Sequence, residues 1–533
     1  MLFRSSPIDS TPVDDTGTVA PEWLSLQVWP ASIVVEPTAT WALRVVGTDP
    51  DGATDDLPGD LGTPTYTSDD TAVATVDASG IVTAVAVGTT TLRVTMGGLE
   101  AQSQVEVRDD GLLTVTVLDG YTGLPIEDAR IALPFTSPVR TDASGVAQLE
   151  AKTAGEMTFS AWVDDTYDSL TVTGLVGRQV TVSILPKDTT LRDASIEGTV
   201  DYSNVDDADW SEVVVGFAVA SIQGSLGSTN LEDLFADDRT ITVFGVDAEA
   251  PENLFVESYA DTYSTPALPG QAALWGLAGP VAISDVTSGL SGSGDALGLL
   301  ADNLSAMSWG QVTGLTMTAA TVTSADLAPA DRFDGTLDIS APPLSTGFVG
   351  DEEYFFLATE ERADEGFLVS GLGTGTAAAT STIATVLPGT VVDSLGTSVL
   401  AYAQVDGVGS GGPVSAAVGT DDGSGTVIVP MLQDIALIDS WDAETHALSV
   451  TTDSDAHFVR IRLRDERNRI HDILAPASWS GDVPNCVTDF RWANAEIEVL
   501  SLETTTGNYE DWLATGDIDV DDKTVVTAAR TTE

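Results

Sequence analysis

The feature that most constrains the fold is a series of short alternating runs separated by glycine and aspartate turns. Apolar and polar residues alternate over 72–76, the turn sequence Asp77-Ala-Ser-Gly80 follows, and two further runs occupy 81–85 and 89–95. A period of two places every second side chain on the same face of a strand, so one face can be buried while the other meets solvent. Short strands joined by tight turns are typical of antiparallel sandwiches. The segment therefore predicts an all-β fold.

The length and charge of the chain set further limits. The 533 residues are too many for one hydrophobic core, and a hydrophobic content of 43% is enough to bury several. The 82 acidic residues outnumber the 21 basic ones and give a net charge of −61. Such a charge opposes binding to nucleic acid or anionic lipid and favours solubility and bound cations. It fits either adaptation to saline surroundings or an ordinary acidic secreted protein.

The aspartate-rich segment resembles a known module. It has a Ser-Asp lead-in at 68–69, Val-Ala-Thr-Val at 73–76, Asp-x-x-Gly at 77–80 and Gly-Thr-x-x-Leu at 88–92. This order resembles the bacterial immunoglobulin-like domain, group 2, and we expect the module to span about 23–108. Modules of that family are spacers and displays on secreted and surface proteins, so the resemblance implies export and a non-catalytic role.

A second resemblance follows at about 111–187. It rests on Thr122-Gly-Leu-Pro125 with Ala129-Arg130, on Thr141-Asp-Ala-Ser-Gly145, and on a closing strand at 179–185. These pieces resemble the carboxypeptidase regulatory-like, or transthyretin-like, sandwich. The resemblance implies a small seven-stranded accessory unit that is usually not catalytic.

The rest of the chain is assigned by composition and pattern. Residues 1–22 are rich in Pro, Asp, Thr and Ser and predict a flexible leader. Residues 188–430 predict a β-rich middle region of one or two sandwiches, and 431–533 predict a last sandwich. The fold class is thus all-β, a tandem of antiparallel immunoglobulin-like β-sandwiches with a few short helices. Helices are expected at 230–235 and at the apolar positions Leu297, Leu300, Leu304 and Met307.

Several classes of enzyme are excluded by missing motifs. No lysine follows a glycine, so a P-loop is absent, and the single Cys486 excludes thiolate zinc sites and intrachain disulfides. The three histidines lack the spacing of metal ligands. We therefore predict no enzyme and no certain cofactor. A secreted hydrolase remains the weaker alternative, because two catalytic carboxylates cannot be chosen among 82.

Calcium is the most plausible ligand, because hard cations prefer several oxygens at close range. Closely spaced aspartates supply them in three segments, and solvated acidic loops are the alternative in each. The candidates are Asp49, Asp51, Asp55 and Asp56, then Asp206, Asp207 and Asp209, then Asp517, Asp519, Asp521 and Asp522.

One concentration of positive charge predicts an interface. Its members are Arg460, Arg462, Arg464, Arg467 and Arg469. The first three alternate with apolar residues and so share one strand face. They either dock on an acidic surface of another copy, since the planar guanidinium binds carboxylates in a bidentate manner, or pair with carboxylates of their own domain.

The sequence thus predicts an exported structural or adhesion protein of the cell surface or extracellular space, able to self-assemble. Expected partners are a second copy or a neighbouring surface protein, without nucleic acid or membrane insertion. No stretch resembles a membrane span, and the first residues lack the long apolar core of a signal peptide. The alternative is a carbohydrate- or protein-binding surface protein, in which Trp479, Trp492 and Trp512 either stack on sugar rings or belong to the core.

Overall fold

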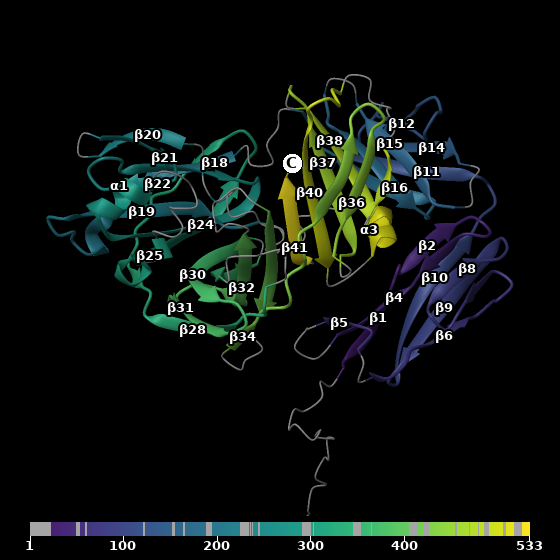
Figure 1. Ribbon diagram of the computed structural model, residues 1–533, viewed down its shortest axis with the longest axis horizontal. Helices are drawn as coiled ribbons and strands as arrows, with labels where there is room; N and C mark the ends of the chain where they lie inside the picture. The colour runs from purple at the N-terminus through teal and green to yellow at the C-terminus, as the bar shows by residue number, and fades with distance from the viewer. Residues whose placement is uncertain are drawn as a thin grey trace, which may run out of the picture.

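The computed structural model is built almost entirely of β-strands, which confirms the all-β prediction (Figure 1). The structure describes residues 23–532 apart from the following segments: 49–53, 59–60, 121–122, 152–154, 164–165, 188–193, 224–233, 235, 237, 244–245, 290–299, 302, 345–352, 364, 405–412, 421–425, 454–455, 468, 478, 484–489, 505–507 and 516–524. The predicted leader at 1–22 lies outside the described residues.

The first unit packs a four-stranded sheet, ordered β2-β10-β9-β6, against the three-stranded sheets β1-β4-β5 and β3-β8-β7. The alternation of side chains along a strand decides which of them face the core. In β9, every second residue from Thr90 to Met96 is buried. Leu92 and Val94 of this strand meet Val28 and Val45 of the opposite layer in one core. The strands are β1 (Ser25–Trp29), β2 (Ser32–Val35), β3 (Thr40–Ala42), β4 (Arg44–Thr48), β5 (Thr54–Asp56), β6 (Thr65–Ser68), β7 (Ala74–Val76), β8 (Ile81–Ala84), β9 (Gly88–Met96) and β10 (Leu99–Val107).

The predicted turn at 77–80 forms as its residue types require. The carboxylate of Asp77 accepts hydrogen bonds from the amides of Ser79 at 2.8 Å and Ile81 at 3.0 Å. Aspartate is suited to this role because its side chain can bond to the backbone two residues further on. The same sequence at 142–145 forms the same turn, with Asp142 accepting from the amides of Ser144 and Val146.

The second unit shares a core with the C-terminal part of the chain. Its sheet β14-β11-β17 packs against a long sheet that begins β13-β12-β15-β16 and continues through parallel pairing of β16 with β38. Phe159 of β15 therefore lies in one hydrophobic cluster with Phe458 and Leu502, about 300 residues away along the chain. The strands are β11 (Leu112–Asp119), β12 (Arg130–Ala132), β13 (Val139–Arg140), β14 (Val146–Glu150), β15 (Met157–Trp162), β16 (Ser169–Leu175) and β17 (Gln179–Ile184).

The C-terminal strands complete a three-layer arrangement. One face of the sheet β38-β37-β40 contributes Phe458 and Leu500 to the core of the second unit. The other face contributes Ile461 and Val499 to a separate core beneath the sheet β35-β36-β39. The elements are β35 (Leu437–Asp442), β36 (Ala447–Thr451), β37 (Phe458–Arg464), β38 (Ile470–Pro476), β39 (Ser480–Asp482), β40 (Glu496–Thr504), α3 (Tyr509–Thr515) and β41 (Val525–Thr532).

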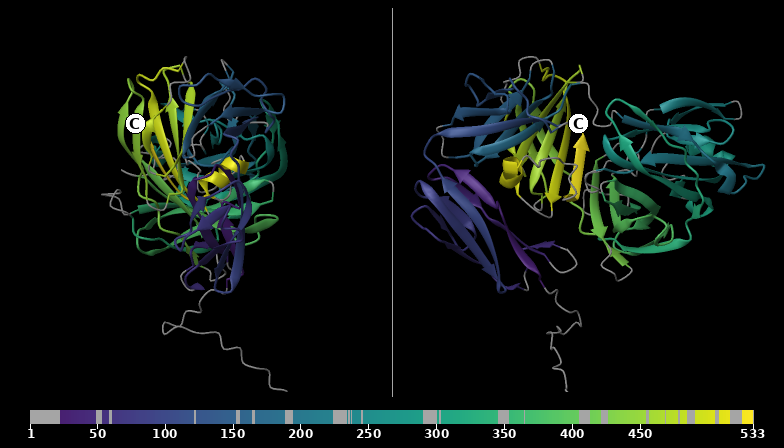
Figure 2. Two further views of the ribbon diagram at one scale, coloured as in Figure 1. Left: turned by 90° about the vertical axis from the view of Figure 1, so that its right-hand side faces the viewer. Right: turned by 180° about the vertical axis from the view of Figure 1, so that it is seen from behind.

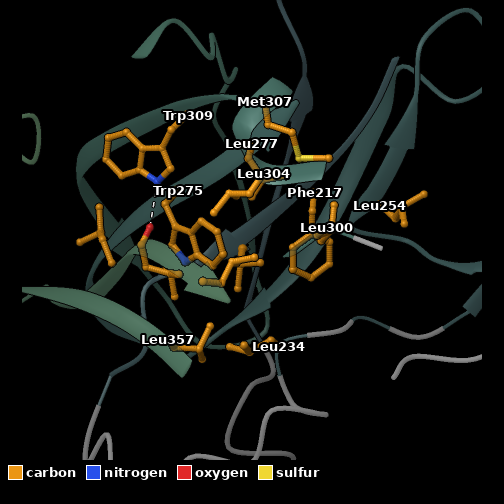
Figure 3. Packing of buried hydrophobic residues seen from close by; sticks show 14 of the residues in the cluster. Phe217, Leu234, Leu254, Trp275, Leu277, Leu300, Leu304, Met307, Trp309 and Leu357 are labelled. Atoms are coloured by element: carbon orange, nitrogen blue, oxygen red, sulfur yellow. Dashed lines mark hydrogen bonds between the residues drawn. The ribbon is translucent and has the colours of Figure 1, made fainter. Parts of the chain in front are cut away.

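The middle of the chain forms its own cores. Trp275 and Trp309 lie at the centre of the largest, where the indole of Trp309 donates a 2.8 Å hydrogen bond to the carbonyl of Val369 (Figure 3). The sheets are β23-β18-β26, β22-β19-β24-β25-β27, the hairpin β20-β21, and the far part of the long sheet, β33-β32-β29-β30-β31-β28-β34. The bounds are β18 (Ala194–Thr199), η2 (Tyr202–Asn204), β19 (Glu212–Ala220), β20 (Asp238–Val243), β21 (Val246–Pro251), β22 (Leu254–Val256), β23 (Thr262–Ala267), β24 (Gly270–Ala282), α1 (Ile283–Gly289), η4 (Leu304–Ala306), β25 (Ser308–Met317), β26 (Val322–Ser324), β27 (Asp331–Arg332), β28 (Gly335–Ser340), β29 (Glu353–Arg362), β30 (Gly366–Thr376), β31 (Thr380–Thr385), β32 (Ser394–Gln404), β33 (Val414–Thr420) and β34 (Thr426–Ile428).

The hydrophobic clusters divide the described residues into two bodies. Three clusters and the half-buried residues packed on them lie within 194–435, which we name the inserted body. The other three lie within 23–187 and 436–515, which we name the flanking body. The inserted body is thus an excursion of the chain between two parts of the flanking body (Figures 1 and 2). The predicted domain boundaries stay a prediction.

One of the two expected short helices forms in part, since residues 300, 301 and 303 are helical and η4 follows them. Leu300, Leu304 and Met307 are buried in the core of the inserted body, while Leu297 and most of 230–235 lie outside the described residues. The helices α1 and α3 are seven residues each, too short to show an amphipathic period in the sequence.

Candidate functional site

The predicted arginine face lies on β37 and the turn that follows it. Arg462 stands opposite Asp472 of β38 and binds both of its carboxylate oxygens, at 2.9 and 3.0 Å. Arg460 donates to the same carboxylate at 3.1 Å. Burial lowers the pKa of Arg462, but the charge of Asp472 outweighs this effect and leaves the pKa above its ordinary value. These two arginines and Asp472 form an ion-paired, half-buried group within one sheet.

Asp465 organises the turn between β37 and β38. Its buried carboxylate accepts hydrogen bonds from the amides of Arg467 at 2.8 Å, Arg469 at 3.1 Å and Arg491 at 3.1 Å. The guanidinium of Arg469 donates to it at 2.6 Å. Burial alone would raise the pKa of Asp465, yet these donors and the charge of Arg469 hold it below the usual value. Arg464 and Arg467 have exposed side chains at this end of the sheet.

A buried polar group joins β38 to the second unit. His471 is fully buried and lies within hydrogen-bond distance of the hydroxyls of Ser169 (2.8 Å from Nδ1) and Thr171 (3.1 Å from Nε2), both on β16. Burial lowers the pKa of His471 to about 4, so the ring is neutral at neutral pH. On the opposite face of the sheet, burial raises the pKa of Asp168 to about 6, although the amide of Ile470 opposes the shift. A Ser–His contact without access for a substrate acts as a structural connection and not as a nucleophile.

Polar contacts also fix the first unit against the rest of the flanking body. Arg44 binds Asp56 and donates a 2.7 Å hydrogen bond to the carbonyl of Thr504. His457 accepts from the amide of Thr504 at 3.1 Å through Nδ1 and lies 3.7 Å from Asp56 through Nε2. Burial raises the pKa of Asp56, but hydrogen bonds from His457 and Arg44 outweigh it, so the pKa is lowered.

Helix α3 forms the other side of this joint. The carboxylate of Glu510 accepts from the amides of Val176 at 2.6 Å and Gly177 at 2.8 Å, between β16 and β17. The next residue, Asp511, accepts from the amide of Ala31 in the first unit at 3.2 Å. Burial raises the pKa of Glu510 to about 7, and the two amides act against that rise. Sequence reasoning missed this helix and both of its carboxylates.

Most predicted calcium ligands fall outside the described residues. This is the case for Asp49, Asp51, Asp517, Asp519, Asp521 and Asp522, and for the side chain of Asp55. Asp56 is bound by Arg44, and Asp206 forms an ion pair with Arg332. In the part of the chain that the structure describes, no three His, Cys, Asp or Glu side chains are grouped for a metal ion. The calcium sites stay a prediction.

The structure places two of the three aromatic candidates for sugar stacking in cores, which was the other predicted alternative. Trp492 is buried and stacks on His446 with ring centres 4.3 Å apart, and Trp512 is buried against Phe458. Both belong to cores because they complete the apolar faces of the central sheet, and Trp479 is half-buried. The exposed tryptophan is Trp210, which is 94% accessible beside the acidic segment 206–209. In the sequence, Trp210 is flanked by Ala208, Asp209, Ser211 and Glu212 near the start of β19. These small or polar neighbours were the signal that its side chain is exposed.

The comparisons with known proteins agree with one of the two resemblances. The family described as bacterial Ig-like domain matches residues 62–109, which overlap the C-terminal half of the predicted first module. The carboxypeptidase regulatory-like assignment of 111–187 stays a prediction. A search of curated proteins finds no match to this sequence. Among the described residues, none of the helices has the length and apolar character needed to traverse a bilayer.

Solved structures provide distant similarities. Domains 4–9 of the surface layer protein SbsC are 12% identical, with 96% of this chain and 82% of that chain covered and a TM-score of 0.16. The Bacillus anthracis TIE protein is 11% identical over 77% and 71%, with a TM-score of 0.15. Two B repeat units of the collagen binding protein of Staphylococcus aureus are 9% identical over 76% and 99%, with a TM-score of 0.14. Scores this low carry no argument about function. The chain is an all-β protein with a bacterial Ig-like segment at 62–109.

Proposed function

We propose that the chain is a structural or adhesive component of a bacterial cell surface or extracellular assembly. The observation that carries the proposal is the bacterial Ig-like segment at 62–109 within a chain made of packed β-sandwich units. Units of this kind bury their apolar residues in cores and leave strand edges and loops for contacts. The contacts of Arg44 with Thr504 and of His457 with Asp56 support a fixed orientation of the first unit, as a spacer requires.

A secreted hydrolase, the weaker alternative, would need two carboxylates facing a substrate. A cavity between the end of β19 and the end of β23 is lined by residues that include Ser221, Ile222 and Leu268 and by no carboxylate. Its volume of about 10 Å³ is room for a single water molecule, so this cavity does not serve as such a site.

Electron microscopy and light scattering of the purified chain test the assembly proposal. We expect filaments, sheets or defined oligomers whose amount increases with protein concentration. Dispersed monomers at every concentration, together with no binding to bacterial cell walls or host surface proteins, would contradict it.

We keep the predicted docking of arginines on another copy as a proposal for Arg467, whose side chain is exposed, because Arg460, Arg462 and Arg469 bind carboxylates of their own domain. Replacing Arg467 by Ser should weaken assembly without loss of stability if its guanidinium docks on an acidic surface. Unchanged assembly of this variant would rule out the docking role.

Carbohydrate binding is the second candidate, favoured by the exposure of Trp210. An exposed indole ring provides an apolar platform for a sugar. A glycan array with the native chain and with Trp210→Ala separates the candidates: binding that disappears in the variant supports carbohydrate recognition, and an empty array for the native chain contradicts it.

A further inference from the structure

The turn between β12 and β13 presents the most exposed large apolar side chain among the described residues. Phe135 is 107% accessible, so its ring lies wholly in solvent. Its backbone has φ of +63°, in the left-handed region that a bulky residue rarely adopts. Both features cost free energy, because an apolar ring stays in water and the Cβ crowds the following carbonyl. Folding alone therefore gives no reason for a phenylalanine at this position.

A second turn in the same chain shows what the backbone requires. Leu387-Pro388-Gly389-Thr390 matches Leu133-Pro134-Phe135-Thr136 at three of its four positions. In both turns the threonine amide donates to the leucine carbonyl, at 3.0 Å in the first and 3.1 Å in the second. Gly389 has φ of +85°, because this turn needs a positive φ at its third residue and glycine adopts it without strain. Phe135 stands where the matching turn has glycine, and strain of this kind is concentrated at functional sites.

The turn holds the backbone of Phe135 in one conformation. Pro134 fixes the backbone before it, and the hydroxyl of Thr136 donates a 2.9 Å hydrogen bond to the carbonyl of Leu133. The strand that follows, β13, is the first in the order of the long sheet, so no described strand pairs with its outer side, and β12 lies near the top of the flanking body in Figure 1. A segment that is ordered before binding loses little entropy in a contact. The turn is thus suited to anchor another molecule.

The charge of the chain indicates which molecule fits. Two copies with a net charge of −61 repel each other, so a contact between them needs a surface without free carboxylates. Residues 129–141 contain no aspartate or glutamate, and Arg140 at the base of the hairpin pairs with Asp128 at 3.3 Å. A two-fold contact needs one such surface, because both copies contribute the same patch, whereas a head-to-tail contact needs two. The hairpin of Phe135 meets this requirement by itself.

We propose that Phe135 anchors a two-fold contact between two copies of the chain, in which their turns at 133–136 pack against each other. This inference rests on the proposed assembly at a surface. The two rings leave water together, and aromatic pairs attract each other beyond the area that they bury. Because a single turn buries little area, the contact is weak in dilute solution and forms at the high local concentration of a surface array.

Sedimentation velocity of the full chain between about 10 µM and about 1 mM measures this contact. The native chain should form a dimer whose share grows with concentration. Phe135→Gly introduces the residue type of the matching turn, so it should keep or raise the urea midpoint and raise the dimer dissociation constant at least about tenfold. The matched control Phe135→Gly/Gly389→Phe moves the ring to the other turn, where a Cβ meets nothing within 4 Å. It should dimerise as weakly as Phe135→Gly.

Salt and cross-linking test the nature and the symmetry of the contact. Raising NaCl from about 0.1 M to about 1 M screens the repulsion between copies and should increase the dimer, whereas a contact made by ion pairs would weaken. In a Cys486→Ser background, Ser137→Cys should cross-link two copies through a short thiol reagent, since equivalent residues meet near a two-fold axis. Ser324→Cys, at an exposed position on β26, is the control and should stay monomeric.

The outcomes separate this contact from the proposed function. A dimer that persists in Phe135→Gly, or that Gly389→Phe restores, overturns the inference and leaves the proposed assembly intact. A dimer of the native chain without the Ser137→Cys cross-link overturns the two-fold contact. Binding to bacterial cell walls that is lost in Phe135→Gly, without any dimer, also overturns the inference, because the ring then anchors a different partner. A native chain that stays monomeric and binds no cell wall or host surface protein removes both proposals.

Discussion

At the scale of single residues, two glycines with left-handed backbone show what local sequence demands. Gly145 ends the Asp142 turn with φ of +74°, and a Cβ there would lie 2.6 Å from the carbonyl of Val117 and 2.9 Å from Pro125. Gly98 has φ of +88° in the hairpin between β9 and β10, and a Cβ there would meet nothing within 4 Å. A side chain at positive φ costs roughly 1–2 kcal/mol by itself. Only Gly145 adds a collision with backbone.

The two glycines therefore form a matched pair. We expect Gly98→Ala to lower the free energy of unfolding by about 1 kcal/mol and Gly145→Ala by about 3 kcal/mol, since overpacking adds 1–3 kcal/mol. Urea unfolding of both variants measures the difference. Equal losses would mean that the chain around Val117 and Pro125 adjusts freely to the added methyl group.

His471 makes the free energy of unfolding depend on pH, because its ring binds a proton less readily in the folded chain than in the unfolded chain. Its pKa is about 4 in the folded chain and about 6.5 when unfolded. Above pH 6.5 the ring is neutral in both states. As the pH falls from 6.5 to 4 the unfolded chain binds the proton first, so up to about 3 kcal/mol of stability is lost. Asp168 and Glu510 act in the opposite direction, because their raised pKa values of about 6 and about 7 let the folded chain bind protons first.

Comparison with His471→Gln isolates this contribution. The variant should be less stable than the native chain at pH 7, and the difference should shrink by about 3 kcal/mol at pH 4. Denaturant unfolding at both pH values, in the same buffer ions, measures it. Parallel pH profiles for the two proteins would show that His471 is protonated in the folded state as readily as in the unfolded state.

At the scale of elements, α3 shows a short helix that is fixed by its contacts. Seven residues cannot form a stable isolated helix, so packing of Trp512 and Leu513 in the core and the bonds of Glu510 hold it. Without Glu510, the amides of Val176 and Gly177 would lose their acceptor. An unsatisfied buried amide costs roughly 1–3 kcal/mol.

We expect Glu510→Ala to lower the free energy of unfolding by about 2 kcal/mol and to raise hydrogen exchange at the amides of Val176 and Gly177. Asp511→Ala is the matched control on the same helix. It removes the exposed 3.2 Å hydrogen bond from Ala31 and should cost less than about 1 kcal/mol. Equal effects of the two substitutions would argue that α3 is held by its apolar residues alone.

Turns and strands that are determined by neighbouring residues could be predicted from the sequence. Pairings between segments that are far apart in the chain could not. The turns at 77–80 and 142–145 and the alternating strands on each side follow from neighbouring residues. Alternation tells which face of a strand is buried but not which strand lies beside it. The pairing of β16 with β38 and the burial of Trp492 depend on residues hundreds of positions away. The ion pairs of Arg460 and Arg462 were one of two predicted alternatives, and the choice required the register of β37 against Asp472.

At the scale of the whole molecule, the predicted calcium sites can be tested without knowing their geometry. A ligand that binds the folded chain alone raises the midpoint of thermal unfolding. If the aspartates at 49–56 or 517–521 bind calcium, 1,000-fold excess over the dissociation constant should add about 4 kcal/mol. Melting curves with calcium and with chelator, at matched ionic strength, measure it. Superimposed curves would indicate that these aspartates do not bind calcium and belong to solvated acidic loops.

The net charge of −61 opposes the compact state, because 82 acidic residues are confined with only 21 basic ones. Added salt shortens the screening length from about 10 Å at 0.1 M to about 3 Å at 1 M and so weakens repulsion between exposed carboxylates. Like-charged neighbours cost about 0.2–0.5 kcal/mol each, so relief of several should raise the free energy of unfolding by ~2 kcal/mol between 0.1 and 1 M NaCl. The half-buried pair of Arg462 and Asp472 is screened less and should persist.

Urea unfolding at the two salt concentrations, repeated in KCl to exclude a specific sodium effect, measures the gain in the free energy of unfolding. A gain of this size favours adaptation to saline surroundings, whereas a loss would show that ion pairs outweigh repulsion and favour an ordinary acidic secreted protein.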